Sequence, residues 1–174
     1  MAFTPYATVA DNGVMCLSAS KTWNVTGLKC GVLICSTAEQ FARLSQQTVP
    51  FREMAGVLGV TANIVAFTDP AAEVWRTECL SYLDGNRRLL AELLDRHLPG
   101  TRYWLPEATF LAWVDCAPLG LPQAPATVFL EQGKVRLYDG SPFGQEGTRW
   151  VRMNFATTRH ILTQIVERMG QTVA

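Results

Sequence analysis

The sequence has no excess of charge of either sign. Fifteen Lys and Arg residues are balanced by fifteen Asp and Glu residues, with no basic patch and no acidic tail. Proteins that bind nucleic acid usually present a basic face or stripe. We therefore expect no nucleic-acid partner.

Long apolar runs, targeting signals and metal motifs are also lacking. No apolar run reaches the roughly 18 residues of a transmembrane helix, so no membrane association is expected. Residues 1–12 lack the basic and apolar segments of a signal peptide. The five cysteines show no CxxC spacing, and neither His97 nor His160 has a metal-like partner. Free thiols of this kind predict a cytoplasmic protein, and we expect no metal.

The remaining composition is that of a globular protein. Of the 174 residues, 48% are apolar and 17% are charged. This length suffices for one domain with a core or for two small domains. Internal repeats and low-complexity tracts are absent, so the information lies in local strings of residues.

The most informative string is SASKTWNVTGLK at residues 18–29, between two short apolar runs. The runs at 14–17 and 31–35 predict strands, so Lys21 is held between packed segments and can be aimed at one place. A neutral lysine amine attacks a carbonyl carbon to form a Schiff base. Two hydroxyls and a second cation at fixed spacing suit a phosphate group. The alternative is a solvated Ser/Lys turn between strands.

This string resembles the pyridoxal-phosphate lysine signature of the class I/II (fold type I) aminotransferases, and most closely that of their cystathionine β-lyase-like branch, the MalY/PatB type. The resemblance implies that Lys21 is the catalytic residue and the covalent attachment point of pyridoxal 5'-phosphate. It implies that Ser18 and Lys29 hold the cofactor phosphate. Ser20 also matches the signature and is a further cofactor-binding candidate.

A second string, WVRMNFA at residues 150–156, lies on a predicted strand after a glycine-rich loop. It resembles the place where the same family carries its substrate-carboxylate arginine, which implies this role for Arg152. A guanidinium suits the role because it binds a carboxylate through two parallel hydrogen bonds. The alternative is an exposed or acid-paired strand arginine, and Arg149 and Arg159 are near enough in sequence to be mistaken for it.

Before residue 100 the sequence predicts mainly helices. A capping box at 36–39 predicts a helix through residue 47. Residues 56–67 are apolar nearly all round, which predicts a buried helix. Asp69 followed by Pro70 predicts the start of a helix that reaches His97. Its expected inward stripe is Trp75, Cys79, Tyr82, Leu83, Leu90, Leu93 and Leu94.

After residue 100 the pattern changes to short strands and two helices. The predicted strands are 102–104, 109–115, 135–138 and 150–155, and the predicted helices are 126–132 and 158–169. The expected fold class is α/β, as the C-terminal portion of a PLP-dependent transferase fold. The expected domains are a remnant of the large PLP-binding domain at 1–68, a long linking helix at 69–99 and a C-terminal α+β small domain at 100–174.

The resemblance covers only the C-terminal part of the family. The family's glycine-rich turn under the phosphate, its ring-stacking aromatic residue and its aspartate at the pyridine nitrogen cannot be placed here, since Asp11 stands at the wrong distance from Lys21. The runs at 14–17 and 31–35 are then expected to expose bare apolar faces. We expect a shortened version of a longer enzyme, or a piece that folds with a partner.

For the intact family the resemblance implies a carbon–sulfur β-lyase acting on cystathionine or similar small-molecule amino acids. Aminotransfer is the nearest alternative, because the same residues serve both reactions. A third possibility is a catalytically inactive fragment that acts only as a binding or assembly module. The family also implies a homodimer for the intact enzyme.

Overall fold

The computed structural model describes residues 3–50 and 54–173, which form two compact units, Met1–Cys79 and Leu80–Ala174. We call these the first and the second unit. The boundary between them falls inside the longest helix, α5 (Pro70–His97).

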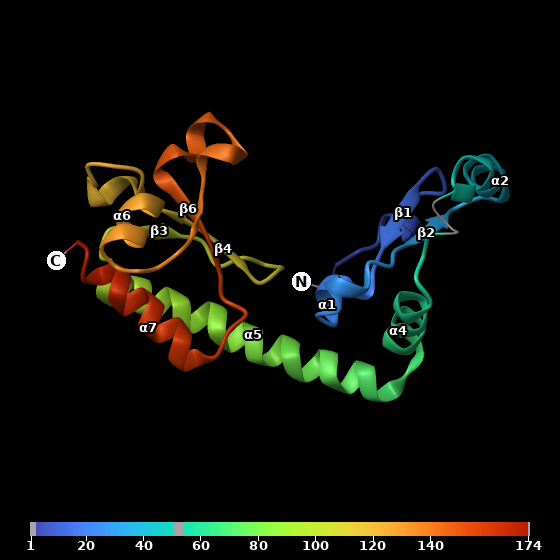
Figure 1. Ribbon diagram of the computed structural model, residues 1–174, viewed down its shortest axis with the longest axis horizontal. Helices are drawn as coiled ribbons and strands as arrows, with labels where there is room; N and C mark the ends of the chain where they lie inside the picture. Colours follow the sequence, from blue (N-terminus) through green and yellow to red (C-terminus); the bar gives the residue numbers. More distant parts are fainter. Residues whose placement is uncertain (1–2, 51–53, 174) are drawn as a thin grey trace. The chain divides into compact units, whose positions relative to one another are not determined.

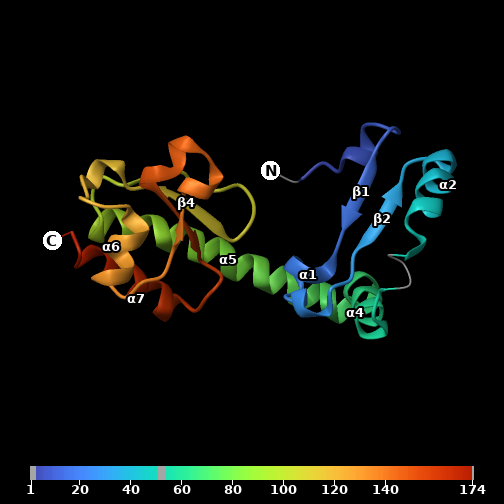
Figure 2. The same ribbon diagram turned by 45° about the horizontal axis from the view of Figure 1, so that its top comes forward.

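The first unit is built on a pair of antiparallel strands, with Val14 opposite Cys35. Figure 2 shows α1 at one end of this strand pair, close to α4. The elements of the first unit before α5 are a 3-10 turn at Tyr6–Thr8, β1 (Val14–Leu17), α1 (Ala19–Thr22), a 3-10 turn at Thr26–Leu28, β2 (Val32–Cys35), α2 (Ala38–Gln47) and α4 (Val57–Thr68).

Both predicted strands of the first unit are present, but neither is buried on both faces. Val32, Leu33 and Ile34 are 39%, 49% and 39% exposed. An apolar run without alternation needs cover on both sides of its sheet, and the described residues do not supply it. The expectation of bare apolar faces is confirmed.

The prediction that residues 56–67 form a buried helix is half wrong. The helix forms as α4, yet only Gly59, Asn63 and Ala66 are buried, while Val57 and Leu58 are 75% and 71% exposed. A helix that is apolar all round needs neighbours all round. In the described residues it contacts mainly α1 and the turn at Thr26–Leu28.

The capping box of α2 lies one residue later than predicted. Thr37 is the N-cap; its Oγ1 accepts a hydrogen bond from the Gln40 backbone N–H at 3.2 Å, and Gln40 Oε1 accepts one from the Thr37 N–H at 3.3 Å. Glutamine serves this motif as well as glutamate. Ser36 is used elsewhere, because its hydroxyl donates to the carbonyl of Gly13 at 2.8 Å.

The long helix α5 begins where the sequence predicts. Asp69 Oδ1 accepts a hydrogen bond from the Ala71 N–H at 2.8 Å, as an N-cap residue does. Its C-terminal part is buried through Leu90, Leu93 and Leu94, as expected. The N-terminal half of the predicted stripe is only partly right: Trp75 and Tyr82 are 44% and 41% exposed, whereas Cys79 is half-buried and Leu83 packs against the core.

The second unit contains a four-stranded antiparallel sheet in the order β3-β4-β6-β5. α7 lies along the C-terminal part of α5 in both Figure 1 and Figure 2, and the carbonyl of His97 closely approaches Gly170. The elements after α5 are β3 (Arg102–Tyr103), β4 (Leu111–Asp115), a 3-10 turn at Ala117–Leu119, α6 (Pro125–Glu131), β5 (Tyr138–Asp139), 3-10 turns at Ser141–Phe143 and Gln145–Arg149, β6 (Trp150–Asn154) and α7 (Arg159–Gly170).

The predicted strand at 135–138 is mostly wrong. Only Tyr138 of that run pairs in the sheet, opposite Arg152. Val135 and Leu137 instead pack their side chains with the core of the second unit. Burial of these apolar side chains therefore explains the pattern without a strand ladder.

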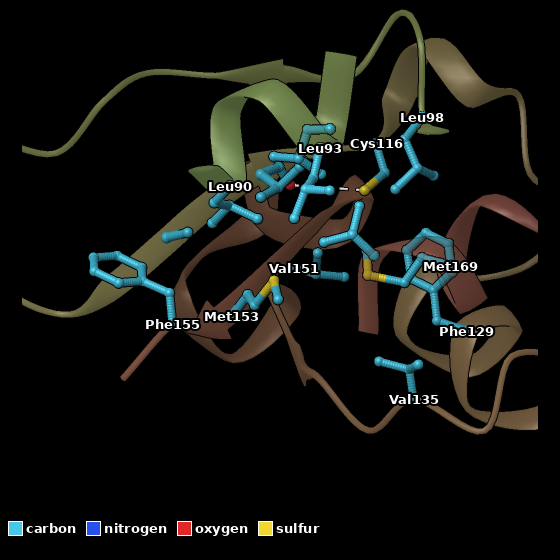
Figure 3. Close-up of a cluster of buried hydrophobic side chains, with 14 of the residues drawn as sticks. Leu90, Leu93, Leu98, Cys116, Phe129, Val135, Val151, Met153, Phe155 and Met169 are labelled. Carbon is cyan, nitrogen blue, oxygen red and sulfur yellow. Dashed lines mark hydrogen bonds between the residues drawn. The ribbon is translucent and has the colours of Figure 1, made fainter. Parts of the chain in front are cut away.

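One face of the sheet forms the core of the second unit. Buried side chains from α5, β4, α6, β6 and α7 pack together there, as Figure 3 shows. Ala112 and Val114 of β4 and Val151 and Met153 of β6 point to this core. Because side chains alternate along a strand, Arg152 and its strand partners point to the opposite face.

Candidate functional site

The segment that carries Lys21 is tied down at its start. Ser18 is the N-cap of α1, and its Oγ accepts a hydrogen bond from the Ser20 N–H at 3.1 Å. The same hydroxyl donates to the Cys30 carbonyl at 2.7 Å, which links α1 to the segment that enters β2. Lys21 lies in the last turn of α1, so its backbone is positioned by these contacts.

A buried asparagine holds the segment from the other side. The N–H of Ala19, which is fully buried, donates to Asn63 Oδ1 at 3.1 Å. Asn63 Nδ2 donates in turn to the carbonyl of Gly59 at 2.9 Å. Sequence reasoning missed Asn63, although a lone asparagine in the otherwise apolar run of α4 is a usable signal, since a buried amide needs partners.

Trp23 packs with other side chains of the first unit. Its indole N–H donates to the Ala72 carbonyl at 2.9 Å. Its ring meets Phe67 edge-on, with the centroids 5.2 Å apart. These contacts make Trp23 a packing residue of the first unit rather than a free neighbour of the lysine.

The sequence-predicted hydroxyls are brought together. Ser18 Oγ and Ser20 Oγ lie 2.6 Å apart. Lys29 follows a 3-10 turn and adopts a left-handed backbone with φ of 47°. Within residues 3–50 and 54–173, neither Lys21 nor Lys29 has a side-chain hydrogen bond or ion pair, and both are exposed. Two hydroxyls and two unpaired amines therefore lie within one short segment.

Arg152, in the second unit, sits between two aromatic rings. Its guanidinium carbon lies 4.4 Å from the ring centre of Tyr138 and 4.8 Å from that of Phe143. Its Nε is buried without a hydrogen-bond partner. In the part of the chain that the structure describes, Arg152 forms no ion pair, so its charge is not neutralised by a neighbouring acid.

The two nearby arginines are engaged in structural contacts. Arg149 donates to the backbone carbonyls of Gln123 and Leu121 at 3.3 and 3.0 Å. The guanidinium of Arg159 lies 5.0 Å from the ring centre of Tyr82, and its backbone N–H donates to the Tyr82 hydroxyl. Of the three, Arg152 is therefore the candidate for binding an anion.

A cavity in the first unit lies beside the lysine segment, with Leu17, Cys30 and Asn63 among its lining residues. It has a volume of about 820 Å³ and is lined mainly by apolar side chains of β1, β2, α2 and α4, such as Leu33, Phe41 and Ile64. Ser18, Ser20, Lys21 and Lys29 do not line it. We interpret it as a bare packing face rather than a reaction site, because most of its lining is apolar and none of the described charged side chains lines it.

Residues 3–50 and 54–173 contain neither a cluster of metal ligands nor a membrane-spanning helix. No group of three or more His, Cys, Asp or Glu side chains is placed to hold a metal ion. No helix there combines the length and the hydropathy needed to cross a bilayer.

Comparison with known proteins places this geometry in a family. Residues 2–169 match the family model described as "Aminotransferase class I and II". The chain belongs to the class I and II aminotransferase family.

Within this family, the similar proteins include carbon–sulfur lyases. A Mycobacterium tuberculosis protein named "Putative cystathionine beta-lyase" is 38% identical over 98% of this chain and 46% of its own length. The cystathionine beta-lyase of Corynebacterium glutamicum is 29% identical over 94% of this chain and 43% of its own length.

A solved structure gives the same picture of the fold. The crystal structure of a "putative plp-dependent beta-cystathionase" from Corynebacterium diphtheriae matches with a TM-score of 0.87 and 30% identity, over 92% of this chain and 42% of that chain. The predicted fold class, part of a PLP-dependent transferase fold, is confirmed. The chain thus spans less than half the length of the relatives it matches.

Proposed function

We propose that this chain carries the cofactor lysine and the substrate-carboxylate arginine of a PLP-dependent carbon–sulfur β-lyase. The observation that carries the proposal is the SASKTWNVTGLK segment, whose Lys21 amine is exposed and unpaired on a backbone that Ser18 and Asn63 hold in place. The names of the similar proteins supply the reaction class.

The residues present fit pyridoxal 5'-phosphate in their chemistry. Lys21 offers a primary amine for the aldehyde, and Ser18, Ser20 and Lys29 offer hydroxyls and an ammonium for the phosphate. Because Ser18 gives its proton to the Cys30 carbonyl at 2.7 Å, Ser20 is the donor in the 2.6 Å contact between the two hydroxyls, and a phosphate would have to take the place of Ser18 Oγ as its acceptor. When bound, the cofactor supplies an electron-withdrawing ring that stabilises negative charge at the substrate Cα.

The chain's own groups then have separate tasks. Arg152 binds the substrate carboxylate and so orients the bond from Cα to its hydrogen. Lys21, once its amine is free, removes the Cα proton as a general base. The overall reaction converts cystathionine or a cysteine S-conjugate and one water molecule into a thiol, pyruvate and ammonia.

The whole-protein features remain part of the proposal. We assign 1–68 to a large cofactor domain, 69–99 to a linking helix and 100–174 to a small domain. We further propose a cytoplasmic location, because the five cysteines are free, and no nucleic-acid partner, because the net charge of the chain is zero. A homodimer of the intact enzyme is proposed from the family resemblance alone.

The experiment is an assay of the chain with pyridoxal phosphate and L-cystathionine. Release of pyruvate, lost in Lys21→Ala and strongly reduced in Arg152→Lys, is the expected result. Exchange of an amino group with a keto acid, without pyruvate, would instead establish aminotransfer, the nearest alternative.

One observation favours a second candidate, an inactive fragment that acts as a binding or assembly module. The bare apolar faces of β2 and α4 need cover that the described residues do not supply. Cofactor binding without turnover, together with self-association in size-exclusion chromatography, would support this candidate. A stable monomer with cooperative unfolding by circular dichroism would contradict it.

A further inference from the structure

The face of the sheet opposite the core carries a cluster of aromatic side chains beside Arg152. Trp113 and Tyr138 are the strand partners of Arg152 on β4 and β5. Phe143, from the turn that follows β5, meets the ring of Trp113 edge-on with the centroids 5.4 Å apart. Trp150 stacks on Trp113 at 5.7 Å. The arginine therefore lies at the edge of a connected aromatic surface.

Two of these rings take part directly in holding the guanidinium. The guanidinium carbon is 4.4 Å from the ring centre of Tyr138 and 4.8 Å from that of Phe143, within the range of a cation–π contact. Arg152 Nε is buried without a partner, whereas Nη1 and Nη2 have no hydrogen bond or ion pair in the described residues. The rings thus fix the plane of the group and leave its outer edge for a ligand.

We propose that Tyr138 and Phe143 are positioning residues that hold the Arg152 guanidinium ready to bind a carboxylate end-on, through its two outer nitrogens. This inference rests on the proposed carboxylate role of Arg152 and adds the two rings that orient its guanidinium. An arginine side chain has many rotamers, and ordering it on binding costs affinity. Rings packed on the guanidinium already restrict its rotamers in the free chain, so less conformational entropy is lost when the ligand binds.

Conservative and non-conservative variants separate this role from simple packing. Tyr138→Phe and Phe143→Tyr keep a ring face over the guanidinium, whereas Tyr138→Leu and Phe143→Leu keep only bulk. Tyr82→Leu is the matched control, because Tyr82 lies over a different arginine, Arg159, at 5.0 Å.

The measurement is a titration of the ¹⁵N-labelled full chain, followed by the NMR signal of the Arg152 side-chain Nε–Hε group. The probe is L-alanine, with L-alaninamide as the analogue that lacks a carboxylate. Arg152→Lys identifies the signal by its loss. Circular dichroism confirms that each variant is folded.

The expected result is a carboxylate-dependent shift in the unaltered chain. Each leucine variant at 138 or 143 should raise the apparent dissociation constant for L-alanine roughly 2- to 5-fold. The ring-preserving variants and Tyr82→Leu should leave it unchanged. The leucine variants should also speed exchange of the Nε proton with water.

The failures of the two proposals are distinguishable. If the unaltered chain shows no difference between L-alanine and L-alaninamide, Arg152 does not bind a carboxylate, and both the proposed role and this inference fall. If it binds, but the leucine variants bind equally well, only the positioning role is overturned. Equal losses in Tyr138→Leu and Tyr138→Phe also overturn it, because the ring face is then not the feature that matters.

Discussion

The side-chain amide of Asn86 on α5 donates a hydrogen bond to the backbone carbonyl of Phe155 at 2.9 Å. The same nitrogen donates to the carbonyl of Thr157 at 2.8 Å, and Asn86 is fully buried. Phe155 and Thr157 lie in the segment that leads from β6 to α7. One buried side chain therefore joins the long helix to the strand that carries Arg152.

Removal of this amide should destabilise the second unit. In Asn86→Ala the part-buried Thr157 carbonyl loses its side-chain donor, and the Phe155 carbonyl keeps only the Thr157 N–H at 2.9 Å, so the free energy of unfolding should fall by about 1–3 kcal/mol. Asn86→Asp should be at least as harmful, because a carboxylate brings acceptors toward two carbonyl oxygens. Urea unfolding followed by circular dichroism measures both. A change under about 0.5 kcal/mol, typical of a surface site, would contradict this account.

Two helical glycines form a matched pair with opposite expected outcomes. A Cβ on Gly59 would closely approach the Leu28 backbone carbonyl, whereas at Gly85 it would meet only the end of the Arg159 side chain, at 3.1 Å. Alanine in a helix is favoured over glycine by about 1 kcal/mol. Gly85→Ala should therefore be neutral or stabilising. Gly59→Ala should be destabilising and should speed amide hydrogen exchange around residues 19–28, which α4 supports. Equal changes in stability at the two sites would contradict the close approach of Gly59 to the Leu28 carbonyl.

The sequence predicted most elements where local chemistry decides them. The start of α5 at Asp69–Pro70, both strands around the lysine and the helix predicted at 158–169 follow from caps and apolar runs alone. The errors concern burial. The sequence of α4 shows that the helix is apolar nearly all round, but not which side chains cover it, and within the described residues Val57 and Leu58 stay exposed.

The candidate site was predicted unevenly for a related reason. Lys21 and Arg152 were found through strings that resemble a family, and the free state of both side chains is in keeping with that prediction. Tyr138 and Phe143 were not assigned to the site, because their contacts with Arg152 follow from strand register and a turn, which have no signature in a single sequence. Asn63 was recognisable as a polar residue in an apolar helix, but its partner, the Ala19 N–H, was not.

Burial of the Cys116 thiol gives a prediction with an internal control. Burial, aided by the neighbouring Asp115 charge, raises the pKa of Cys116 from its ordinary value of 9.0 to about 12. Iodoacetamide at pH 8 should modify the exposed Cys16 quickly and leave Cys116 unmodified until the chain unfolds. Peptide mapping of the alkylated chain measures this. Modification of both at the same rate would show that the thiol is not buried.

The same thiol should make the stability of the chain depend on alkaline pH. Because its pKa is higher in the folded than in the unfolded chain, the folded state holds the proton more tightly. The stabilising contribution of the protonated Cys116 thiol to the free energy of unfolding is fully present below about pH 9 and is lost as pH rises toward 12. The difference between the unaltered chain and Cys116→Ala isolates this effect from that of other groups. A difference that does not change between pH 8 and 11 would contradict it.

The central claim is that the Lys21 amine is the one that takes up pyridoxal phosphate, and the chain supplies its own comparison in Lys29 and Lys134, its two other lysines. The chain is incubated with the cofactor, reduced with borohydride, digested and mapped by mass spectrometry, in parallel with unphosphorylated pyridoxal. The account predicts an adduct predominantly on Lys21, weaker labelling by pyridoxal, and no transfer of the adduct to the other lysines in Lys21→Ala. Equal labelling of all three lysines would contradict it, and so would equal labelling of Lys21 by pyridoxal phosphate and by unphosphorylated pyridoxal.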